Sequence, residues 1–409
     1  MPPPTPEPDV PRPSLAAEIE RLRRRLAESE AELERLGRWL ESLYFDLEAV
    51  LASRRFRWGE AILERGLKRL LRRANRGQAW APDHARELMR DYERWRRRRQ
   101  PERPGPGETR PGPLGALGAA AAEGALDVDV VLCVRDALAD LERCLSALAP
   151  DLNRLGRLII VNDGSEAATT QYLRAFAEGR PGVALIENPE PGGYTRAANQ
   201  GLAAAGAGHV ILLNSDATPT PGWIEGLLEC ARSRPRIGLV GPISNAAAWQ
   251  SVPRPQDLNG DWAVNELPPG LGPEEMGGLL RRLSERRFPA VPYLNGFCLM
   301  IDRRVLETVG LFDEQAFPHG YGEEQDYCLR TAAAGFELAV ADHVYVHHAK
   351  SRSYGYVDRW RLTRVGWKTL ERRYGRRRLR ALDRLWREEP TLGALRGRVR
   401  EEFDRLRTE

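Results

Sequence analysis

The chain has 409 residues, enough for one large domain with appendages or for two domains. Hydrophobic residues make up 42% and charged residues 29%, and no apolar run approaches the roughly 18 residues of a membrane-spanning helix, so we expect a soluble protein rather than an integral membrane protein. The formal net charge of +4 is small for this length, but arginine is concentrated in residues 54–103 and again after residue 359.

The start of the chain and its cysteines indicate the compartment. The segment MPPPTPEPDV has neither the basic region nor the apolar region of a secretory signal, so we expect a cytoplasmic location. The five cysteines are scattered and include no C-x-x-C pair. This spacing argues against a disulfide framework and against a cysteine zinc site.

The first two segments differ in composition. Residues 1–13 are rich in proline, so we expect them to be disordered. Residues 14–52 carry apolar side chains at alternating steps of four and three, and only Ser29 interrupts this seam. Such a heptad pattern predicts a coiled coil, and hence a homo-oligomer or a partner protein. A single amphipathic helix packed on its own chain is the alternative.

Arginine-rich segments flank the middle of the chain. Residues 53–99 have a basic helical pattern, residues 100–125 form a Pro/Gly-rich linker, and residues 357–409 have a second arginine-rich helical pattern. The arginines fit nucleic acid, an anionic membrane surface or a solvated helix face. A solvated face is the commonest of the three, Trp58 and Trp95 beside the arginines are also compatible with peripheral contact with the inner face of a membrane, and nothing resembles a nucleic-acid module.

Between residues 126 and 356, apolar β-rich runs alternate with helical segments. The runs DVDVVLCV (127–134), RLIIVND (157–163), VALIEN (183–188) and HVILLNSD (209–216) are typical of buried strands. Alternating strands and helices imply parallel strands. The sequence therefore predicts an α/β fold, with a doubly wound sheet and helices on both faces.

Acidic residues follow two of these strands and reappear further along. The first two groups are VNDGS (161–165) and LLNSDA (212–217), each of which turn formation alone would explain. An acidic cluster, HGYGEEQDYCLR (319–330), and a histidine pair, VYVHHAKSRSYG (344–355), come later. Carboxyl ends of strands are where open α/β sheets bind ligands, so the ordered set indicates one site.

These segments resemble a family 2 glycosyltransferase with the GT-A fold. The resemblance spans residues 126–356 and rests on a series of short motifs in order. They are VVLCVRDALADLERCL, VNDGS, NPEPGGYTRAANQGL, LLNSDATPTPGW, LNGFCLMIDRRVLETVGLFDE and YGEEQDYCLRTAAAGF.

The resemblance implies how the chain binds its donor, a nucleoside-diphosphate sugar. Asp163 would accept a hydrogen bond from a pyrimidine ring, which favours UDP or dTDP over GDP. Val134 and Arg135 lie in the turn that packs against the base, where the family usually has Tyr-Asn in place of Arg135-Asp136. Arg196 would meet diphosphate oxygens, and a surface arginine is the alternative.

The resemblance also implies a divalent cation, Mn²⁺ or Mg²⁺. Asn214-Ser215-Asp216 matches the family's D-x-D metal motif, with Asn214 in place of the first aspartate. Asp216 would bind both the metal and, through it, the donor diphosphate. His347 or His348 resembles the histidine that completes the site in relatives, and strand alternation points only one of them inward.

The acidic cluster carries the predicted catalysis. By resemblance Glu324 is the general base that takes the proton of an acceptor hydroxyl, and Asp326 is the second candidate. Glu323 and Asn295 would support the site or the acceptor. The alternative is that the cluster only places negative charge at the start of a helix.

We therefore expect an inverting, metal-dependent hexosyl- or deoxyhexosyltransferase. Its acceptor would be a glycan or lipid-linked glycan in the synthesis of a bacterial surface polysaccharide such as O-antigen or capsule. Two alternatives are an assembly subunit with a decayed nucleotide-sugar-binding domain and a nucleotidyltransferase. The second lacks the Gly- and Lys-rich phosphate loop that we would expect after the first strand.

Overall fold

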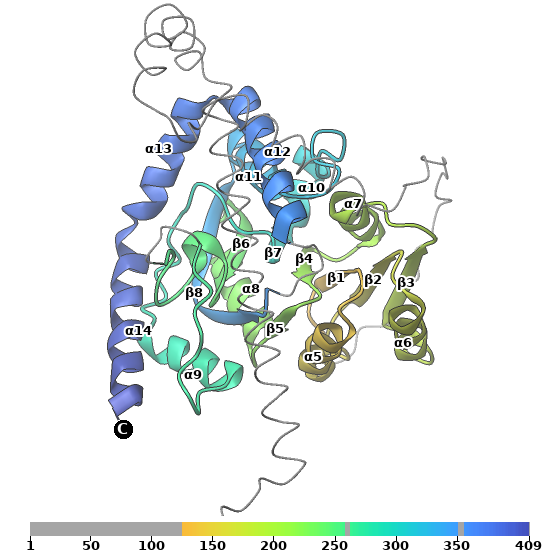
Figure 1. Cartoon of the computed structure of the whole chain (residues 1–409), viewed down its shortest axis with the longest axis horizontal. Coiled ribbons are helices and arrows are strands. Elements are labelled where there is room, and N and C mark those ends of the chain that lie inside the picture. The colour runs from red at the N-terminus through yellow and green to blue at the C-terminus, as the bar shows by residue number, and fades with distance from the viewer. Residues whose placement is uncertain (1–124, 258–261, 351–355, 409) are drawn as a thin grey trace, which may run out of the picture. The chain divides into compact units, whose positions relative to one another are not determined.

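The computed structural model describes residues 125–257, 262–350 and 356–408 (Figure 1). The predicted disordered segment, coiled coil and basic helical region, and nearly all of the predicted linker, lie outside the described residues. Within the described residues, no helix is both long enough and apolar enough to cross a membrane.

The described residues are built on an eight-stranded sheet with the order β3-β2-β1-β4-β7-β6-β8-β5. The first four of these strands are parallel to one another, as the alternation of strand and helix predicted. The strands are β1 (Val128–Val134), β2 (Arg157–Asp163), β3 (Val183–Asn188), β4 (His209–Asn214), β5 (Ala217–Pro219), β6 (Ile237–Ile243), β7 (Cys298–Asp302) and β8 (Glu337–His348).

Helices cover both faces of this sheet (Figure 1). They are α5 (Leu138–Leu148), α6 (Ala167–Ala177), α7 (Tyr194–Ala204), α8 (Trp223–Ser233), α9 (Pro273–Leu283), α10 (Arg303–Val309), α11 (Glu323–Ala333), α12 (Tyr356–Tyr374), α13 (Arg376–Arg387) and α14 (Pro390–Thr408), with short 3-10 turns η1 (Ala149–Asp151) and η2 (Ala248–Gln250).

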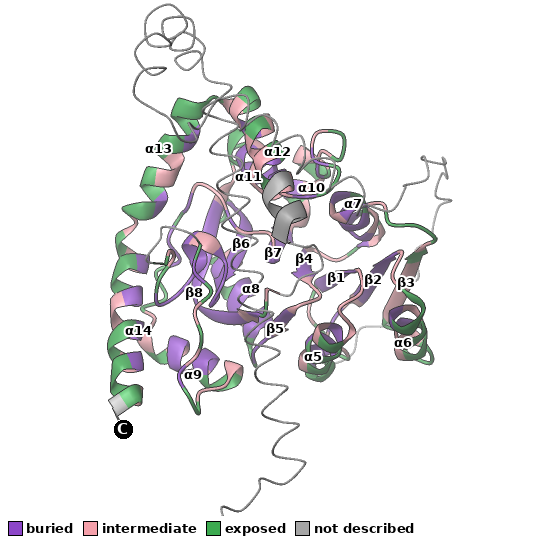
Figure 2. Cartoon of the chain, in the orientation of Figure 1, coloured by how far each residue is buried: buried purple, intermediate pink, exposed green. Residues whose placement is uncertain are grey.

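Alternate residues of the parallel strands enter two separate cores. Val130 and Leu132 of β1 pack with α5 and α8, whereas Val131 packs with α7 on the opposite face. Because successive side chains of a strand point to opposite faces, a strand buried on both sides needs the continuous apolar run that the sequence has. Figure 2 shows these strands buried and the outer faces of the helices exposed.

The second half of the sheet is mixed rather than parallel. Strand β7 is antiparallel to both of its neighbours, β4 and β6. Leu213 near the end of β4 pairs with Cys298 at the start of β7, so residues 295–297 lie at the same edge as residues 214–216. The α/β GT-A fold class is thus confirmed, with a mixed sheet in which an antiparallel strand brings a distant loop to the ligand-binding edge.

Strand β8 brings the histidine pair to that same edge. It is parallel to β6 and antiparallel to β5, in a register that pairs Ala217 with His348 and Thr218 with His347. The polar step after β4 therefore lies directly beside the end of β8.

The C-terminal helices pack into the core of the sheet. Trp386 of α13 and Leu395, Val399 and Phe403 of α14 belong to the same buried cluster as Val131 of β1. The arginines of α13 are exposed, as are Arg400, Arg405 and Arg407 of α14, so most of the basic charge of these two helices lies on their outer faces, which Figure 2 shows as exposed. The helices predicted at residues 357–409 are confirmed as helices.

Candidate active site

A cavity of about 530 Å³ opens at the carboxyl ends of β1, β2 and β4. Segments far apart in sequence line it, including the loop before β7, the start of α11, the end of β8 and residues of α12 and α13. Most of the site residues predicted from sequence line it, namely Val134, Arg135, Asp163, Asp216, Asn295, Glu323, Glu324 and His348.

Asp163, the last residue of β2, holds the turn that leads into α7. Its carboxylate accepts hydrogen bonds from the N–H groups of Gly192 (2.7 Å) and Gly193 (2.9 Å) and from the side-chain amide of Asn188 (3.0 Å). A side chain at Gly193 would collide with the carbonyl of Pro318, and Gly193 has a φ of 94°. A carboxylate offers about four acceptor positions, so roughly one remains for a ligand.

Asp216 and His348 form the polar centre of the cavity. Nε2 of His348 lies 3.3 Å from Oδ1 of Asp216, and Nδ1 lies 2.9 Å from the carbonyl oxygen of Ala246. The imidazole stacks on Phe297, with 4.9 Å between ring centroids and 16° between planes. These contacts hold the ring in one orientation.

The orientation of His348 suits a divalent cation. A carbonyl oxygen can only accept, so Nδ1 carries the hydrogen and the lone pair of the neutral ring is on Nε2, toward Asp216. A lone pair facing a carboxylate is repulsive unless a proton or a metal ion is shared between them. A nitrogen and an oxygen ligand, with Nδ1 bonded to a carbonyl, fit Mn²⁺ or Mg²⁺. No group of three or more acidic, histidine or cysteine side chains is placed to bind a metal within the described ranges, so water and substrate oxygens would complete the shell.

His347 lies outside the cavity. Its Nδ1 is 3.1 Å from the hydroxyl of Tyr345, and it lines a separate hollow with Arg143 and Thr218. Burial lowers the pKa of His347, and the neighbouring His348 and Arg143 lower it further. The alternation of β8 therefore distinguishes the two histidines, and only His348 reaches Asp216.

Glu323 and Glu324 open α11 at the cavity. Glu324 is half-buried and accepts a hydrogen bond from the N–H of Gly322 (3.1 Å). Glu323 is 4% exposed, and its Oε2 has no hydrogen-bond partner among the described residues. Burial raises the pKa of Glu323 well above its ordinary value, and the negative charge of Glu324 raises it further. Burial therefore favours the neutral form of Glu323, beside a second carboxyl group that is open to the cavity.

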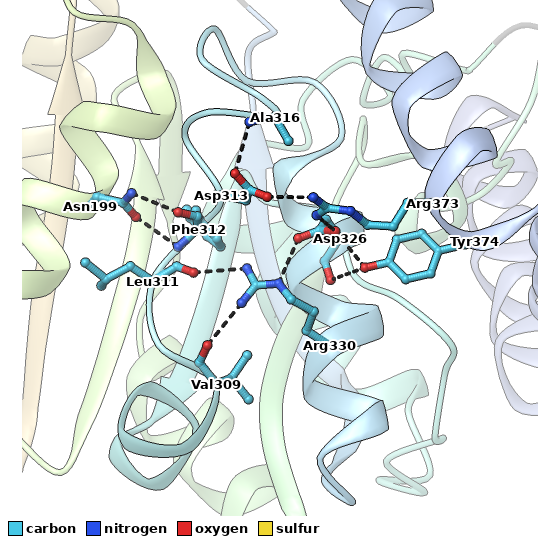
Figure 3. Close-up of polar contacts among 10 residues, drawn as sticks. All are labelled: Asn199, Val309, Leu311, Phe312, Asp313, Ala316, Asp326, Arg330, Arg373 and Tyr374. Atoms are coloured by element: carbon cyan, nitrogen blue, oxygen red, sulfur yellow. Dashed lines mark hydrogen bonds and ion pairs between the residues drawn. The ribbon is translucent and has the colours of Figure 1, made fainter.

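Asp326 does not line the cavity. It is fully buried and bonds to Nε of Arg330 (2.8 Å), Nη1 of Arg373 (2.6 Å) and the hydroxyl of Tyr374 (2.6 Å). Arg373 also pairs with Asp313, as Figure 3 shows. The Asp326 carboxylate thus links α11 to α12, and its contacts stabilise the packing of these two helices.

Asn295 and Arg196 have local roles in the structure. The N–H of Asn295 donates to Oε1 of Gln250 (2.7 Å), and its Oδ1 accepts from the N–H of Phe297 (3.1 Å), which shapes the loop before β7. Arg196 is exposed on α7 and does not line the cavity, but its Cδ lies beside Gly192.

Sequence reasoning missed several residues that line the cavity. Among them are the aromatic side chains of Tyr194, Trp249, Trp262, Tyr293, Trp367 and Trp386, together with Asp383. Burial raises the pKa of Tyr194, and nearby acidic groups raise it further. The tryptophans in the polar stretch at residues 244–262 were the sequence feature that could have indicated these lining residues, because a large aromatic side chain in a loop often marks a binding surface.

Comparison with known proteins agrees with this geometry. Residues 129–310 match the model of glycosyl transferase family 2. Over 226 residues the chain is 28% identical to a pre-mycofactocin glycosyltransferase of Mycobacterium tuberculosis, covering 54% of this chain and 42% of that protein. It is 29% identical over 231 residues to an N-acetylglucosaminyl-diphospho-decaprenol L-rhamnosyltransferase of the same organism, covering 53% of this chain and 73% of that protein.

The chain thus spans less than half the length of the first relative. A solved structure, the mannosyltransferase PcManGT from Pyrobaculum calidifontis in complex with GDP-Man and Mn²⁺, aligns with a TM-score of 0.42 and 18% identity over 68% of each chain. The residues matched by the family model include Asp163 and Asp216 and end before Glu323, Glu324 and His348. Residues 129–310 are therefore similar to the glycosyl transferase family 2 domain.

Proposed function

We propose that this chain transfers a sugar from a nucleoside-diphosphate sugar to a hydroxyl group of an acceptor, with inversion at the anomeric carbon. One observation carries the proposal: Asp163, Asp216, His348 and Glu324 come from separate segments and line one cavity. The family and the names of the relatives support glycosyl transfer as the reaction class.

The donor nucleotide binds at the ends of β1 and β2. Asp163 accepts a hydrogen bond from the N–H of a uracil or thymine ring, which selects UDP or dTDP over GDP. Val134 and Arg135 pack against the base and ribose, since both line the cavity beside Asp163. Arg196 meets the diphosphate by swinging from the surface of α7, where a long side chain can reorient at small cost.

Asp216 and His348 hold the divalent cation, Mn²⁺ or Mg²⁺. When bound, the cation neutralises the charge that develops on the nucleoside-diphosphate leaving group. The imidazole nitrogen favours Mn²⁺ over Mg²⁺, since magnesium prefers oxygen ligands. Asn214, which also lines the cavity, supplies a neutral amide where the family motif has a second carboxylate.

Glu324 is the general base. It removes the proton from the acceptor hydroxyl while that oxygen attacks the anomeric carbon from the face opposite the diphosphate, in a single displacement. Burial favours the neutral form of Glu323, which limits the negative charge at the start of α11, and Glu324 is the half-buried carboxylate that accepts the proton.

The acceptor is a growing bacterial surface glycan such as O-antigen or capsule, carried on a lipid. The lipid-linked substrate in the name of the rhamnosyltransferase relative supports this assignment. A soluble enzyme reaches such an acceptor at the cytoplasmic face of the membrane, where residues 54–103 supply basic charge. If a variant lacking residues 54–103 binds anionic vesicles as well as the full chain, this membrane role is wrong.

The test of the reaction is a screen of UDP-, dTDP- and GDP-sugars for nucleoside-diphosphate release, with and without Mn²⁺. We expect release that requires the metal and that falls by about 10²–10⁴-fold in Glu324→Gln, the usual contribution of a general base. Equal release by wild type and Glu324→Gln would remove the assignment of the base. Metal-dependent nucleotide binding without any release would instead favour an assembly subunit with a decayed site.

A further inference from the structure

One side of the cavity is an aromatic wall, formed by Trp249, Trp262, Tyr293, Asp383 and Trp386. The rings of Trp249 and Trp262 meet edge to face, with centroids 5.2 Å apart, and those of Tyr293 and Trp386 lie 6.0 Å apart. Trp262 is 44% exposed, so part of its surface is accessible from the cavity. The wall joins the loop around η2 to α13.

The aromatic wall also contains polar atoms that lack full partners. The indole N–H of Trp249 completes no hydrogen bond with a described residue, although the side chain is only 5% exposed and its nitrogen lies near the hydroxyl of Tyr293. The Tyr293 hydroxyl donates to Asp383, and no other described residue donates to that carboxylate. A buried donor and a carboxylate with spare acceptor positions thus flank exposed aromatic surface.

The wall lies next to the proposed base. A side chain at Gly296 would meet Cβ of Glu324 at 3.2 Å, so Glu324 packs on the loop that begins at Tyr293. Gln250, which follows Trp249, binds the N–H of Asn295 in that same loop. The wall is therefore continuous with the surface beside Glu324, and α13 contributes Asp383 and Trp386 to it.

We propose that the aromatic wall binds a sugar ring of the acceptor and holds it for attack. This inference rests on the proposed function, because it names the substrate class that the second half of the cavity takes. The apolar C–H face of a pyranose packs on Trp262, one ring hydroxyl donates to Asp383, and the Trp249 N–H donates to a sugar oxygen. The acceptor hydroxyl then lies toward Glu324.

The polar atoms distinguish a sugar from a purely apolar ligand. An alkyl or prenyl chain against the same wall would leave the buried indole N–H without a partner and the half-buried Asp383 carboxylate with only the Tyr293 hydroxyl as a donor, which opposes binding. A sugar ring satisfies both groups and covers the aromatic surface. The lipid part of a lipid-linked acceptor therefore lies outside the wall.

The test measures binding of methyl glycosides of glucose, galactose, mannose, rhamnose and N-acetylglucosamine to the full chain by saturation-transfer NMR, with UDP or dTDP and Mn²⁺ present. We expect at least one glycoside to bind, with its ring C–H protons receiving most saturation. Trp262→Ala should weaken that binding by about tenfold or more, through loss of the aromatic surface. Trp249→Phe, which removes the N–H but keeps a smaller aromatic ring, should weaken it by about fivefold.

The matched control is Leu385→Ala, since Leu385 is 59% exposed on α13 and does not line the cavity. Glycoside binding in Leu385→Ala, and UDP or dTDP affinity in all variants, should equal those of wild type. The inference is overturned if no glycoside binds wild type, or if Trp262→Ala and Trp249→Phe bind glycosides normally, while diphosphate release continues. Glycoside binding at the wall without any nucleotide-sugar binding would overturn the proposed function and keep the wall as a sugar site.

Discussion

At the scale of single residues, Glu323 ties the site to stability. Its pKa is raised by burial and by Glu324, so the folded protein keeps this proton above the ordinary value of 4.5, where the unfolded chain has released it. The contribution of Glu323 to the free energy of unfolding is therefore complete below about pH 4.5, and it is lost as pH rises toward the folded-state pKa.

This pH dependence of stability predicts the behaviour of Glu323→Gln, because the glutamine side chain is neutral at every pH. Its melting temperature should exceed that of wild type at pH 7.5, by the equivalent of about 1–3 kcal/mol, and the difference should shrink toward pH 5. Glu307→Gln is the control, because it removes an exposed carboxylate from α10. A difference between wild type and Glu323→Gln that stays constant with pH would contradict the burial argument.

The adjacent histidines give a second prediction at this scale. His348→Gln should weaken Mn²⁺ binding in the presence of UDP or dTDP by about 10–100-fold, because it removes the nitrogen that faces Asp216. His347→Gln is the natural control and should bind Mn²⁺ as wild type does, since its ring lies in a separate hollow. Titration calorimetry measures the Mn²⁺ affinity of both variants. Equal losses of affinity would mean that the substitutions act through the structure rather than by removing a metal ligand.

At the scale of elements, one ion-pair network fixes α11 against α12. Arg373 links Asp326 to Asp313, and Arg330 links Asp326 to the carbonyls of Val309 and Leu311 (Figure 3). Because Glu323 and Glu324 start the same helix that contains Asp326, the network holds the proposed base in place. It acts by positioning that helix, without contact with the cavity.

Removing Arg373 should therefore destabilise the fold. Arg373→Met leaves a fully buried carboxylate with fewer partners, and we expect a loss of about 1–3 kcal/mol, less than for a fully buried pair because the arginine side chain is 37% exposed. Denaturant unfolding measures the loss. Arg372→Met is the control, since Arg372 is exposed and its hydrogen bonds lie within α12. Equal losses of unfolding free energy in both variants would mean that the ion-pair network does not stabilise the fold.

At the scale of the whole described molecule, the C-terminal helices pack into the same buried core as the sheet. Leu395, Val399 and Phe403 of α14 share a buried cluster with the sheet, and Arg396 donates to the carbonyl oxygens of Trp249 and Ser251. This arginine, 7% exposed, ties α14 to the loop that carries the aromatic wall. Helix α14 thus stabilises the loop that carries Trp249, which lines the cavity.

We expect Leu395→Ala to cost about 2–5 kcal/mol of unfolding free energy, as for other large-to-small changes in a packed core. Arg400→Ala, on the exposed side of the same helix, should change the unfolding free energy by less than about 0.5 kcal/mol. Chemical denaturation of both variants is the measurement. If Leu395→Ala unfolds like wild type, α14 is not part of the cooperative fold.

Much of the first half of the fold was predictable because its signals are local. The apolar runs of β1, β2 and β4, and the polar residues that end β2 and β4, follow from strand burial and turn chemistry within a few residues. Parallel strands then put Asp163 and Asp216 at one edge without further information. The sequence motifs also selected Glu324, which lines that cavity.

What the sequence by itself determined, then, is the α/β sheet and the acidic residues at its carboxyl edge, because short-range periodicity specifies both. Only the tertiary structure decided which histidine reaches Asp216, since that depends on the register of β5 with β8. It also decided that Asp326 pairs with arginines away from the cavity and that Trp249, Tyr293 and Asp383 share a wall. These contacts join residues tens to hundreds of positions apart, and packing rather than local pattern brings such residues together.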